Sequence, residues 1–296
     1  MYDVIIIGMG IGGITAGIYG KRAGLNVLMF EKSAPGGMLQ KIDKIQNYPG
    51  FSEISGPDLA LNLFNQVKKV GVPFKFEEVI DVEITEEYKK VITKNGTYEA
   101  KNIIVATGRT PKYLGLDNEK DYLGRGLSTC ASCDGNFYKG EDVAVVGSGN
   151  SALQESLYLA NIVNKVYLLH RGVNFKGDDA LVERVRNTKN IEIVDGVNIK
   201  KINEVEGKIE SVTLDNEKTI NVKGVFIYIG YKPDTEIFKK LDITNINGDI
   251  IVSENFETEI DGLYAIGDCA KKGVYQLVTA ASDGCIAVSD IEKIRN

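Results

Sequence analysis

Two cysteines near the middle of the chain, Cys130 and Cys133, have the C-x-x-C spacing that suits redox or metal chemistry. At this spacing one thiolate can attack a partner's disulfide while the other resolves the mixed disulfide. Asp134 follows directly and can supply or accept the proton, because the chain has only one histidine for such work. These residues favour dithiol-disulfide exchange.

Two other interpretations of the cysteine pair compete with exchange. A metal site needs two further ligands, for which only the distant Cys269 and Cys285 are available, so we predict no metal. Buried, inert thiols fit poorly among Gly, Ser and Asp residues, although Asp134 can still be only a turn residue. We expect Cys269 and Cys285 to lie in the core and assign them no role.

A glycine-rich turn near the N-terminus predicts a dinucleotide site. An apolar strand over Asp3–Ile7 leads into Gly8-Met9-Gly10-Ile11-Gly12-Gly13, which is G-x-G-x-x-G. The helix that follows carries small residues that let it pack closely on a sheet. A second strand, Leu25–Phe30, then delivers Glu31, 23 residues after Gly8. This order fits an adenine dinucleotide, with the acid on the ribose.

The same pattern occurs a second time. The strand Val143–Val146 leads into Gly147-Ser148-Gly149-Asn150-Ser151-Ala152, with alanine in place of the third glycine. The next strand, Lys165–Leu169, delivers His170 at the same offset of 23 residues. Each copy also has a polar hairpin, around Asn95-Gly96 and Asp215-Asn216, that leads into another strand. Two matched copies indicate two dinucleotide-binding units.

A dithiol beside two dinucleotide units implies a path for electrons. Hydride from a nicotinamide passes to sulfur efficiently only through a carrier that splits the electron pair, and a flavin is such a carrier. A further strand near the C-terminus ends in Gly267-Asp268 and must pair with a strand elsewhere in the chain. We therefore expect electron flow from nicotinamide to flavin to disulfide.

Length and composition exclude several other classes. The 296 residues allow two domains, and 43% hydrophobic with 26% charged residues is typical of a folded globular protein. The net charge of −6, without a basic run, argues against nucleic acid as a partner. The longest uncharged stretch, 4–20, has six glycines in 17 residues and is too short to span a bilayer. We predict a cytoplasmic protein without a membrane segment.

Over nearly its whole length the chain resembles the low-molecular-weight bacterial thioredoxin reductases. The most specific element is Cys-Ala-x-Cys-Asp, here Cys130 to Asp134, placed inside the second unit. The other matching motifs are Gly8 to Gly13, Gly36-Gly37, Asn47-Tyr48-Pro49-Gly50, Ala106-Thr107-Gly108, Gly147 to Ala152 and Gly267-Asp268 with Gln276.

The resemblance implies an α/β fold with two three-layer, Rossmann-like dinucleotide-binding domains. The FAD domain would be discontinuous, at 1–112 and 240–296, and the nicotinamide domain, 113–239, would be inserted between its parts. The implied FAD contacts are Gly8, Gly10, Gly13, Glu31, Gly36, Gly37, Met38, Asn47, Thr107, Gly108, Asp268, Gln276 and Leu277. The implied nicotinamide contacts are Gly147, Gly149, Asn150, Ser151, His170, Arg171 and Lys176.

The resemblance also implies roles and partners. Cys133 would be the thiol nearest the flavin, Cys130 the one that attacks thioredoxin, and Asp134 the acid-base group. The protein would be a homodimer whose two domains rotate, with hinges near Lys112–Leu116 and Tyr231–Ile237.

One departure from the family pattern concerns the electron donor. Where the family has His-Arg-Arg-x-x-x-Arg, this chain keeps His170 and Arg171, but Gly172 replaces the second arginine and Lys176 the third. Lysine keeps the charge and loses the bidentate fork that grips the 2′-phosphate of NADPH. We therefore consider three electron donors, in order of preference: NADPH, NADH and reduced ferredoxin. Met38 and Tyr275 also depart from the family pattern, near the flavin.

The acceptor is predicted less directly. Thioredoxin or a thioredoxin-like protein is the first choice, and a glutaredoxin-like or peroxidase partner is the alternative, since surface contacts around Cys130 decide it. A non-enzymatic flavin-binding protein would leave the dithiol without a task.

Overall fold

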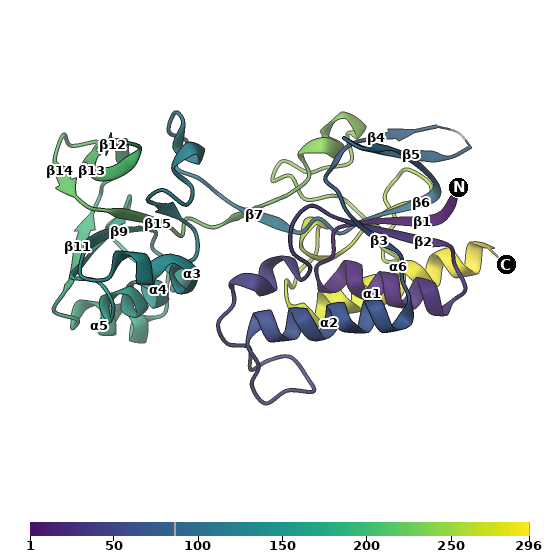
Figure 1. The fold of residues 1–296 in the computed structure, drawn as a ribbon, viewed down its shortest axis with the longest axis horizontal. Helices are drawn as coiled ribbons and strands as arrows, with labels where there is room; N and C mark the ends of the chain where they lie inside the picture. Colours follow the sequence, from purple (N-terminus) through teal and green to yellow (C-terminus); the bar gives the residue numbers. More distant parts are fainter. Residues whose placement is uncertain (86, 296) are drawn as a thin grey trace. The chain divides into compact units, whose positions relative to one another are not determined.

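The structure, a computed structural model, describes residues 1–85 and 87–295 and separates into two compact units (Figure 1). Unit 1 consists of Met1–Thr110 and Lys232–Asn296, and unit 2 is the intervening Pro111–Tyr231. Each contains a parallel sheet of the dinucleotide-binding type, so the predicted α/β class is confirmed.

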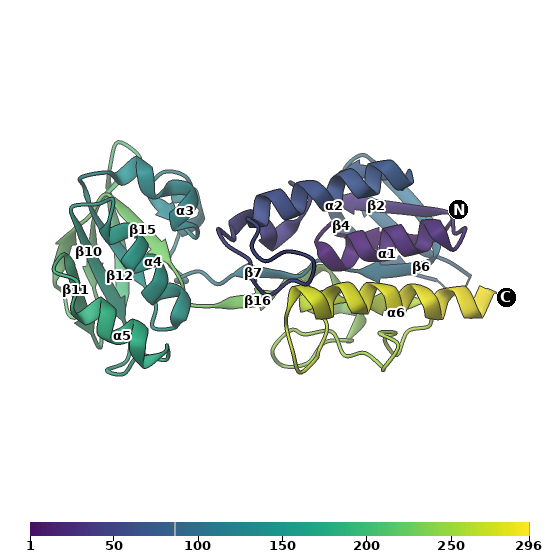
Figure 2. The same cartoon turned by 90° about the horizontal axis from the view of Figure 1, so that it is seen from below.

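Unit 1 contains β1 (Tyr2–Ile7), α1 (Ile11–Arg22), β2 (Val27–Glu31), η1 (Gly37–Lys41), α2 (Gly56–Val70), β3 (Phe74–Phe76), β4 (Val79–Ile84), β5 (Lys89–Thr93), β6 (Gly96–Val105), η4 (Glu236–Leu241), β17 (Leu263–Ala265), η5 (Gly267–Cys269) and α6 (Leu277–Arg295). Its sheet has the order β3-β2-β1-β6-β5-β4, and β17 pairs with β6. The strands β3, β2, β1, β6 and β17 are parallel, whereas β4, β5 and β6 form an antiparallel meander. Figures 1 and 2 show α1, α2 and α6 together on one face of this sheet.

The apolar run of β1 is buried on both sides. Val4 and Ile6 belong to a core cluster with residues of α1 and α6, whereas Ile5 and Ile7 belong to the cluster on the opposite face. Successive strand residues point to opposite faces, so an uninterrupted apolar run requires that both faces be covered. This is why the sequence shows no alternation here.

Small residues bring α1 close to the sheet, as predicted. A Cβ atom added at Gly17 would lie 2.4 Å from Sδ of Met29, and one at Gly20 would lie 2.9 Å from Cγ2 of Val27. Both distances are too short for a real side chain, so the helix can approach β2 only with glycine at these positions.

Unit 2 contains η2 (Glu119–Tyr122), β8 (Leu127–Ser128), α3 (Ala131–Asp134), η3 (Gly135–Tyr138), β9 (Asp142–Val146), α4 (Asn150–Ala160), β10 (Lys165–His170), α5 (Asp179–Arg186), β11 (Ile191–Asp195), β12 (Ile199–Val205), β13 (Lys208–Leu214), β14 (Thr219–Asn221) and β15 (Gly224–Ile227). Its parallel sheet has the order β11-β10-β9-β15-β8. This sheet lies between α3, α4 and α5 on one side and the antiparallel β12-β13-β14 sheet on the other (Figure 1).

The two units repeat one strand plan. In unit 1, β1 lies between β2 and β6, and in unit 2, β9 lies between β10 and β15. The predicted hairpins are confirmed, since Asn95 joins β5 to β6 and Asn216 lies between β13 and β14. The predicted C-terminal strand is β17, and its partner is β6.

The chain crosses between the units at β7 (Arg109–Pro111) and β16 (Tyr231–Pro233), which pair as a two-stranded ribbon. Residues 232–239 were expected in the inserted domain, yet they group with unit 1. The reason lies in η4, because Phe238 is fully buried in the core of unit 1 beside Ile243 and Ile250. The first crossing differs less, because unit 1 ends at Thr110 rather than at residue 112.

Candidate redox and dinucleotide sites

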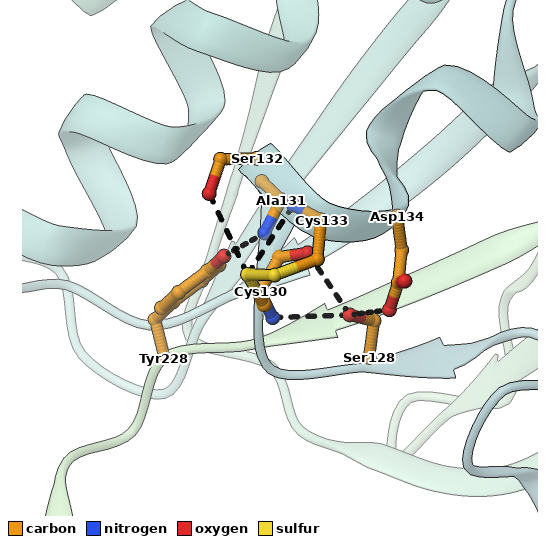
Figure 3. Close-up of a disulfide and its surroundings, with 7 residues drawn as sticks. All are labelled: Ser128, Cys130, Ala131, Ser132, Cys133, Asp134 and Tyr228. Carbon is orange, nitrogen blue, oxygen red and sulfur yellow. Dashed lines mark hydrogen bonds between the residues drawn. A yellow bond between two sulfur atoms is a disulfide. The ribbon is translucent and has the colours of Figure 1, made fainter. Parts of the chain in front are cut away.

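The cysteine pair forms a disulfide in a short helical turn of unit 2 (Figure 3). Cys130 caps α3, the Cα atoms of Cys130 and Cys133 are 5.3 Å apart, and the Cys133 N–H donates to Sγ of Cys130 at 3.3 Å. Oγ of Ser132 lies 3.5 Å from the same sulfur. The two residues predicted to exchange disulfides are thus already joined by the bond that this chemistry breaks and re-forms.

One serine that the sequence pattern does not single out ties the two ends of the turn together. Oγ of Ser128 accepts the N–H of Cys130 at 3.0 Å and donates to the Asp134 carboxylate at 2.6 Å (Figure 3). The same oxygen lies 3.2 Å from the Cys130 carbonyl. Ser128 is only 4% exposed, and hydrogen bonds are stronger in such a low-dielectric setting. Asp134, the predicted acid-base group, is therefore held against the redox turn.

The two sulfurs differ in access. Cys130 is only 8% exposed, whereas Cys133 is exposed to solvent. The disulfide form thus presents Cys133 to solvent more than Cys130, although Cys130 is the thiol predicted to attack a large partner. That assignment stays a prediction, and it requires Cys130 to become accessible once the disulfide has opened.

A tyrosine also contacts the redox turn. The hydroxyl of Tyr228, which follows β15, accepts the N–H of Ala131 at 2.7 Å (Figure 3). Burial raises the pKa of Tyr228, and the nearby Glu155 carboxylate raises it further. Its hydroxyl is therefore protonated at neutral pH. No local sequence pattern indicates this residue, because Ala131 and Tyr228 are 97 positions apart.

The first glycine turn leaves the start of α1 open to an anion. Gly10 caps α1 without a side-chain hydrogen bond, and the first turn carries no acidic residue. A Cβ at Gly8 would lie 2.4 Å from the Ala106 carbonyl oxygen, and one at Gly13 would lie 2.0 Å from the Gly8 oxygen. The first N–H groups of a helix lack partners within the helix and bind phosphate well. This cradle fits the pyrophosphate of FAD.

The acid at the end of β2 is buried beside that turn. Glu31 is 7% exposed and accepts the N–H groups of Met9 and Ser33, each at 2.9 Å. Carboxylate oxygens can accept more than one hydrogen bond each, so capacity remains for the ribose hydroxyls of FAD.

The fold brings other predicted FAD residues together from distant parts of the chain. A Cβ at Gly37, which follows Gly36 at the start of η1, would lie 3.7 Å from Cα of Gly10. Nδ2 of Asn47 donates to Oε1 of Gln276 at 3.2 Å, across 229 positions. Oγ1 of Thr107 is buried beside the Cys269 thiol, with no other hydrogen-bond partner among the described residues, so it retains capacity for a ligand. Of the remaining predicted residues, Met38 lies in η1, Gly108 follows Thr107, Asp268 lies in η5, and Leu277 begins α6.

Two partly buried ion pairs hold the Gly267-Asp268 turn, and neither was predicted. Nε of Arg109 donates to the Asp268 carbonyl at 3.0 Å while its other end pairs with Asp249 at 2.7 Å. Asp283 accepts the Gly267 N–H and pairs with Lys272 at 2.6 Å. Burial raises the pKa of the Asp268 carboxyl, against the opposing effect of Lys272 and Arg109.

The second glycine turn likewise leaves the start of a helix open. Gly149 caps α4 without a side-chain hydrogen bond, and a Cβ at Gly147 would lie 2.3 Å from the Tyr228 carbonyl oxygen. The side chain of Asn150 is already engaged, because it donates to Asp178 at 3.0 Å and accepts the Asp178 N–H at 2.7 Å. Asn150 and its neighbour Ser151 begin α4, so their backbone amides are the groups available to a phosphate.

The predicted adenosine end of this site combines a buried histidine with exposed cations. His170 is 3% exposed, and its Nε2 lies 2.6 Å from Oδ1 of Asp195, a carboxylate at the end of β11 that the sequence pattern does not indicate. Phe175 packs on the imidazole, with ring centroids 4.4 Å apart. Arg171 and Lys176 are exposed. Their binding to a 2′-phosphate stays a prediction.

The other two cysteines are free thiols with different surroundings. Cys269 is fully buried, as predicted, and burial raises its pKa. Cys285 is only half-buried, which differs from the predicted core position. Within residues 1–85 and 87–295, the His, Cys, Asp and Glu side chains form no group of three or more suited to hold a metal ion.

Comparisons with known proteins agree with this geometry. A family model described as pyridine nucleotide-disulphide oxidoreductase matches residues 2–284, and the chain belongs to this family. Thioredoxin reductases of Bacillus subtilis and Mycoplasma pneumoniae are each 38% identical over 99% of this chain, covering 94% and 95% of their own lengths. Within the family, the chain thus groups with the thioredoxin reductases, and this membership implies FAD and NADPH as cofactors.

Solved structures give the same grouping. Lactococcus lactis thioredoxin reductase in its FR conformation superposes with a TM-score of 0.88 at 33% identity, covering 99% of this chain and 98% of that one. The enzyme described as T. acidophilum thioredoxin reductase gives a TM-score of 0.85 at 29% identity, with the same coverage. Across the part of the chain that the structure describes, no helix is both long and apolar enough to cross a membrane.

Proposed function

We propose that this chain reduces the disulfide of thioredoxin, with electrons that pass from NADPH through FAD to the Cys130–Cys133 pair. The carrying observation is the disulfide turn of unit 2, in which the cysteine pair lies beside Asp134. Unit 1 would hold FAD and unit 2 would hold NADPH, because each offers an uncapped helix start behind a glycine turn.

The electrons and bonds balance in this scheme. The glycine turn of unit 1 would hold FAD, which would supply the chemistry that links hydride from NADPH to an electron pair for the protein disulfide. The Cys130–Cys133 bond breaks, and the Cys130 thiolate attacks the thioredoxin disulfide to form a mixed disulfide. The Cys133 thiolate then attacks Sγ of Cys130, which re-forms the protein disulfide and releases the thioredoxin dithiol.

The protons that accompany these steps are assigned to Asp134. Its carboxylate accepts the Ser128 hydroxyl at 2.6 Å, and the Ser128 oxygen accepts the backbone N–H of Cys130. This chain of two hydrogen bonds fixes the carboxylate relative to the redox turn. A general acid-base group works only within reach of the proton that it moves, so this placement supports the role.

The surface beside the disulfide suits a protein acceptor. Phe137, four positions after Cys133, is 82% exposed, which is unusual for a large aromatic side chain. Exposed aromatic side chains commonly anchor protein interfaces. We assign Phe137 to the docking of thioredoxin.

The donor site suits NADPH with moderate affinity. Arg171 and Lys176 offer two cations to the 2′-phosphate, and Gly172 offers none. The names of the relatives do not indicate NADH as donor, nor a glutaredoxin-like or peroxidase acceptor. One solved structure, 30% identical over 99% of this chain with a TM-score of 0.55, is described as a ferredoxin-flavin thioredoxin reductase of Clostridium acetobutylicum, so reduced ferredoxin is the alternative donor that the experiment must exclude. We further propose a homodimer in the cytoplasm.

An anaerobic stopped-flow experiment tests the function. FAD-loaded protein is mixed with NADPH, NADH or reduced ferredoxin, and bleaching of the flavin absorbance is followed. We expect NADPH to bleach the flavin fastest, and the reduced protein to be reoxidised by oxidised thioredoxin. Bleaching by ferredoxin alone would overturn the donor assignment, and failure of thioredoxin to restore absorbance would overturn the acceptor.

A further inference from the structure

Tyr228 lies where the redox turn and the dinucleotide turn of unit 2 meet. Its hydroxyl accepts the Ala131 N–H at 2.7 Å, and its backbone N–H donates to the Val146 carbonyl at 2.7 Å. Its own carbonyl oxygen is the atom that a Cβ at Gly147 would approach to 2.3 Å. The backbone of Tyr228 is therefore fixed by the end of β9 and by the glycine turn.

The amide that Tyr228 holds, the N–H of Ala131, is next in the chain to the reactive Cys130. Ala131 is the first residue of α3 and follows Cys130 directly, so its N–H has no carbonyl partner within the helix. Ala131 is only 1% exposed, which leaves little access for water as a replacement acceptor. Without the Tyr228 hydroxyl, this amide would lose its hydrogen bond in a buried position.

Burial, more than nearby charge, keeps the Tyr228 hydroxyl neutral. Burial raises the pKa of Tyr228, and Glu155, Tyr231 and Asp134 face it and raise it further. The hydroxyl thus acts as a neutral acceptor over the physiological range. Its contribution concerns geometry and not a change of ionisation.

We propose that Tyr228 is a positioning residue for disulfide exchange, which orients Cys130 by fixing the Ala131 amide. The inference rests on the proposed function, and it names a side chain outside the Cys130–Asp134 segment on which the exchange rate depends. Because exchange rates fall steeply when reacting atoms are misplaced, loss of one fixed contact should slow sulfur chemistry without impairing cofactor binding.

The test compares Tyr228→Phe, which removes only the hydroxyl, with Tyr167→Phe as a matched control. Tyr167 is a partly buried tyrosine on β10 of the same unit, packed in the core cluster on the opposite face of the sheet from Ala131. Each FAD-loaded variant is reduced with one equivalent of NADPH and mixed with oxidised thioredoxin in a stopped-flow instrument. Recovery of flavin absorbance gives the maximal rate and the half-saturating thioredoxin concentration separately.

We expect Tyr228→Phe to lower the maximal reoxidation rate about tenfold, which corresponds to the loss of one buried hydrogen bond. The half-saturating thioredoxin concentration, the flavin-reduction rate with NADPH and the FAD content should stay within about twofold of the parent protein. Tyr167→Phe should match the parent in every measurement. This pattern separates positioning from a general loss of structure, which would also lower FAD content and flavin reduction.

Two results would overturn the inference. One is a Tyr228→Phe rate equal to that of the parent, and the other is an equal loss in the control variant. If the parent itself fails to reduce thioredoxin, the proposed acceptor is wrong, and the same comparison is made with an aromatic small-molecule disulfide. A tenfold difference there still supports the positioning role, and equal rates still reject it.

Discussion

The two dinucleotide units share a backbone plan and differ in the side chain that ends the second strand. Glu31 and His170 stand at the same offset from their glycine turns and are 7% and 3% exposed. Glu31 accepts two backbone amides, whereas His170 pairs with the Asp195 carboxylate and is followed by the exposed Arg171. An acid suits free ribose hydroxyls, and a cationic neighbourhood suits a phosphate on the same ribose. One scaffold can thus be fitted to two dinucleotides by a few side chains.

The units also differ in how much of the chain closes on the glycine turn. In unit 1, segments far apart in sequence converge there, since a Cβ at Gly12 would lie 3.0 Å from the Ala280 carbonyl oxygen and one at Gly37 would lie 3.7 Å from Cα of Gly10. In unit 2, the predicted adenosine end is formed by residues close to one strand end, and Arg171 is exposed. We expect FAD to stay bound through many turnovers and the nicotinamide to exchange in each.

The sharpest difference between the units is the dithiol, which only unit 2 carries. Cys130→Ser or Cys133→Ser should lower thioredoxin reduction by at least about 10³-fold, because exchange needs both sulfurs. Flavin bleaching by NADPH should persist in both variants. Incubation with oxidised thioredoxin after reduction should trap a mixed disulfide in Cys133→Ser and not in Cys130→Ser, as gel mobility would report. The reverse result would exchange the roles of the two cysteines.

The third glycine of the G-x-G-x-x-G motif tests whether the glycine turns of units 1 and 2 are equally tight. Gly13→Ala places a Cβ 2.0 Å from the Gly8 oxygen, so we expect FAD content to fall below about a tenth of the parent value. The counterpart in unit 2 is already Ala152, so the control Ala152→Gly should keep FAD and NADPH-dependent activity. Absorbance of the purified proteins gives the FAD content. Normal loading of Gly13→Ala would contradict the tight-turn account.

The cationic end of unit 2 should control the choice of donor. Arg171→Gln removes a charged hydrogen-bond donor, so KM for NADPH should rise about 10- to 100-fold while kcat stays near the parent value. KM for NADH should change little, since NADH lacks the 2′-phosphate. Lys200→Gln, at an exposed lysine on β12, serves as the control and should alter neither constant. Equal increases for both donors would rule out 2′-phosphate recognition by Arg171.

A smaller effect is expected at the serine that supports the acid-base group. Ser128→Ala leaves the Cys130 N–H and the Asp134 carboxylate each without one partner, so kcat for thioredoxin should fall about tenfold. Ser128→Thr keeps the hydroxyl and should restore most of the rate. Both variants should bleach with NADPH like the parent, and a loss shared by Ser128→Thr would point to packing instead.

The smallest effect is a pH-dependent one in unit 1. Burial raises the pKa of Asp268, so the folded apoprotein holds this proton to a higher pH than the unfolded chain does. Stability from this group is therefore present at low pH and declines as pH rises from about 4 through the raised pKa. Asp268→Asn should stabilise the apoprotein at pH 7 relative to pH 4, by less than about 1 kcal/mol because solvent screens a partly exposed group. Urea unfolding at the two pH values measures this, and an equal effect at both would contradict it.

Much of the fold and part of the site are encoded locally. The apolar run of β1, the glycine turns and the small residues of α1 repeat at short spacing, so they predict strand, turn and helix without knowledge of the rest. The C-x-x-C pair and Asp134 lie within five consecutive residues, so a short sequence pattern predicts them as well. These features depend on the backbone and on residues close together in the chain, so they can be predicted from the sequence.

The contacts that hold the site residues in place join groups that are far apart in the chain. Ser128 looks like an ordinary strand residue. Asp195 ends β11 and Tyr228 follows β15, and they lie 25 and 97 positions from the groups that they hold. The ion pair of Arg109 with Asp249 spans 140 positions. A hydrogen bond needs two atoms within about 3 Å, and no local pattern specifies that distance for groups far apart in the chain. Short sequence patterns thus specify the chemistry and the strand plan, whereas the packing of the sheets selects the side chains that hold that chemistry in place.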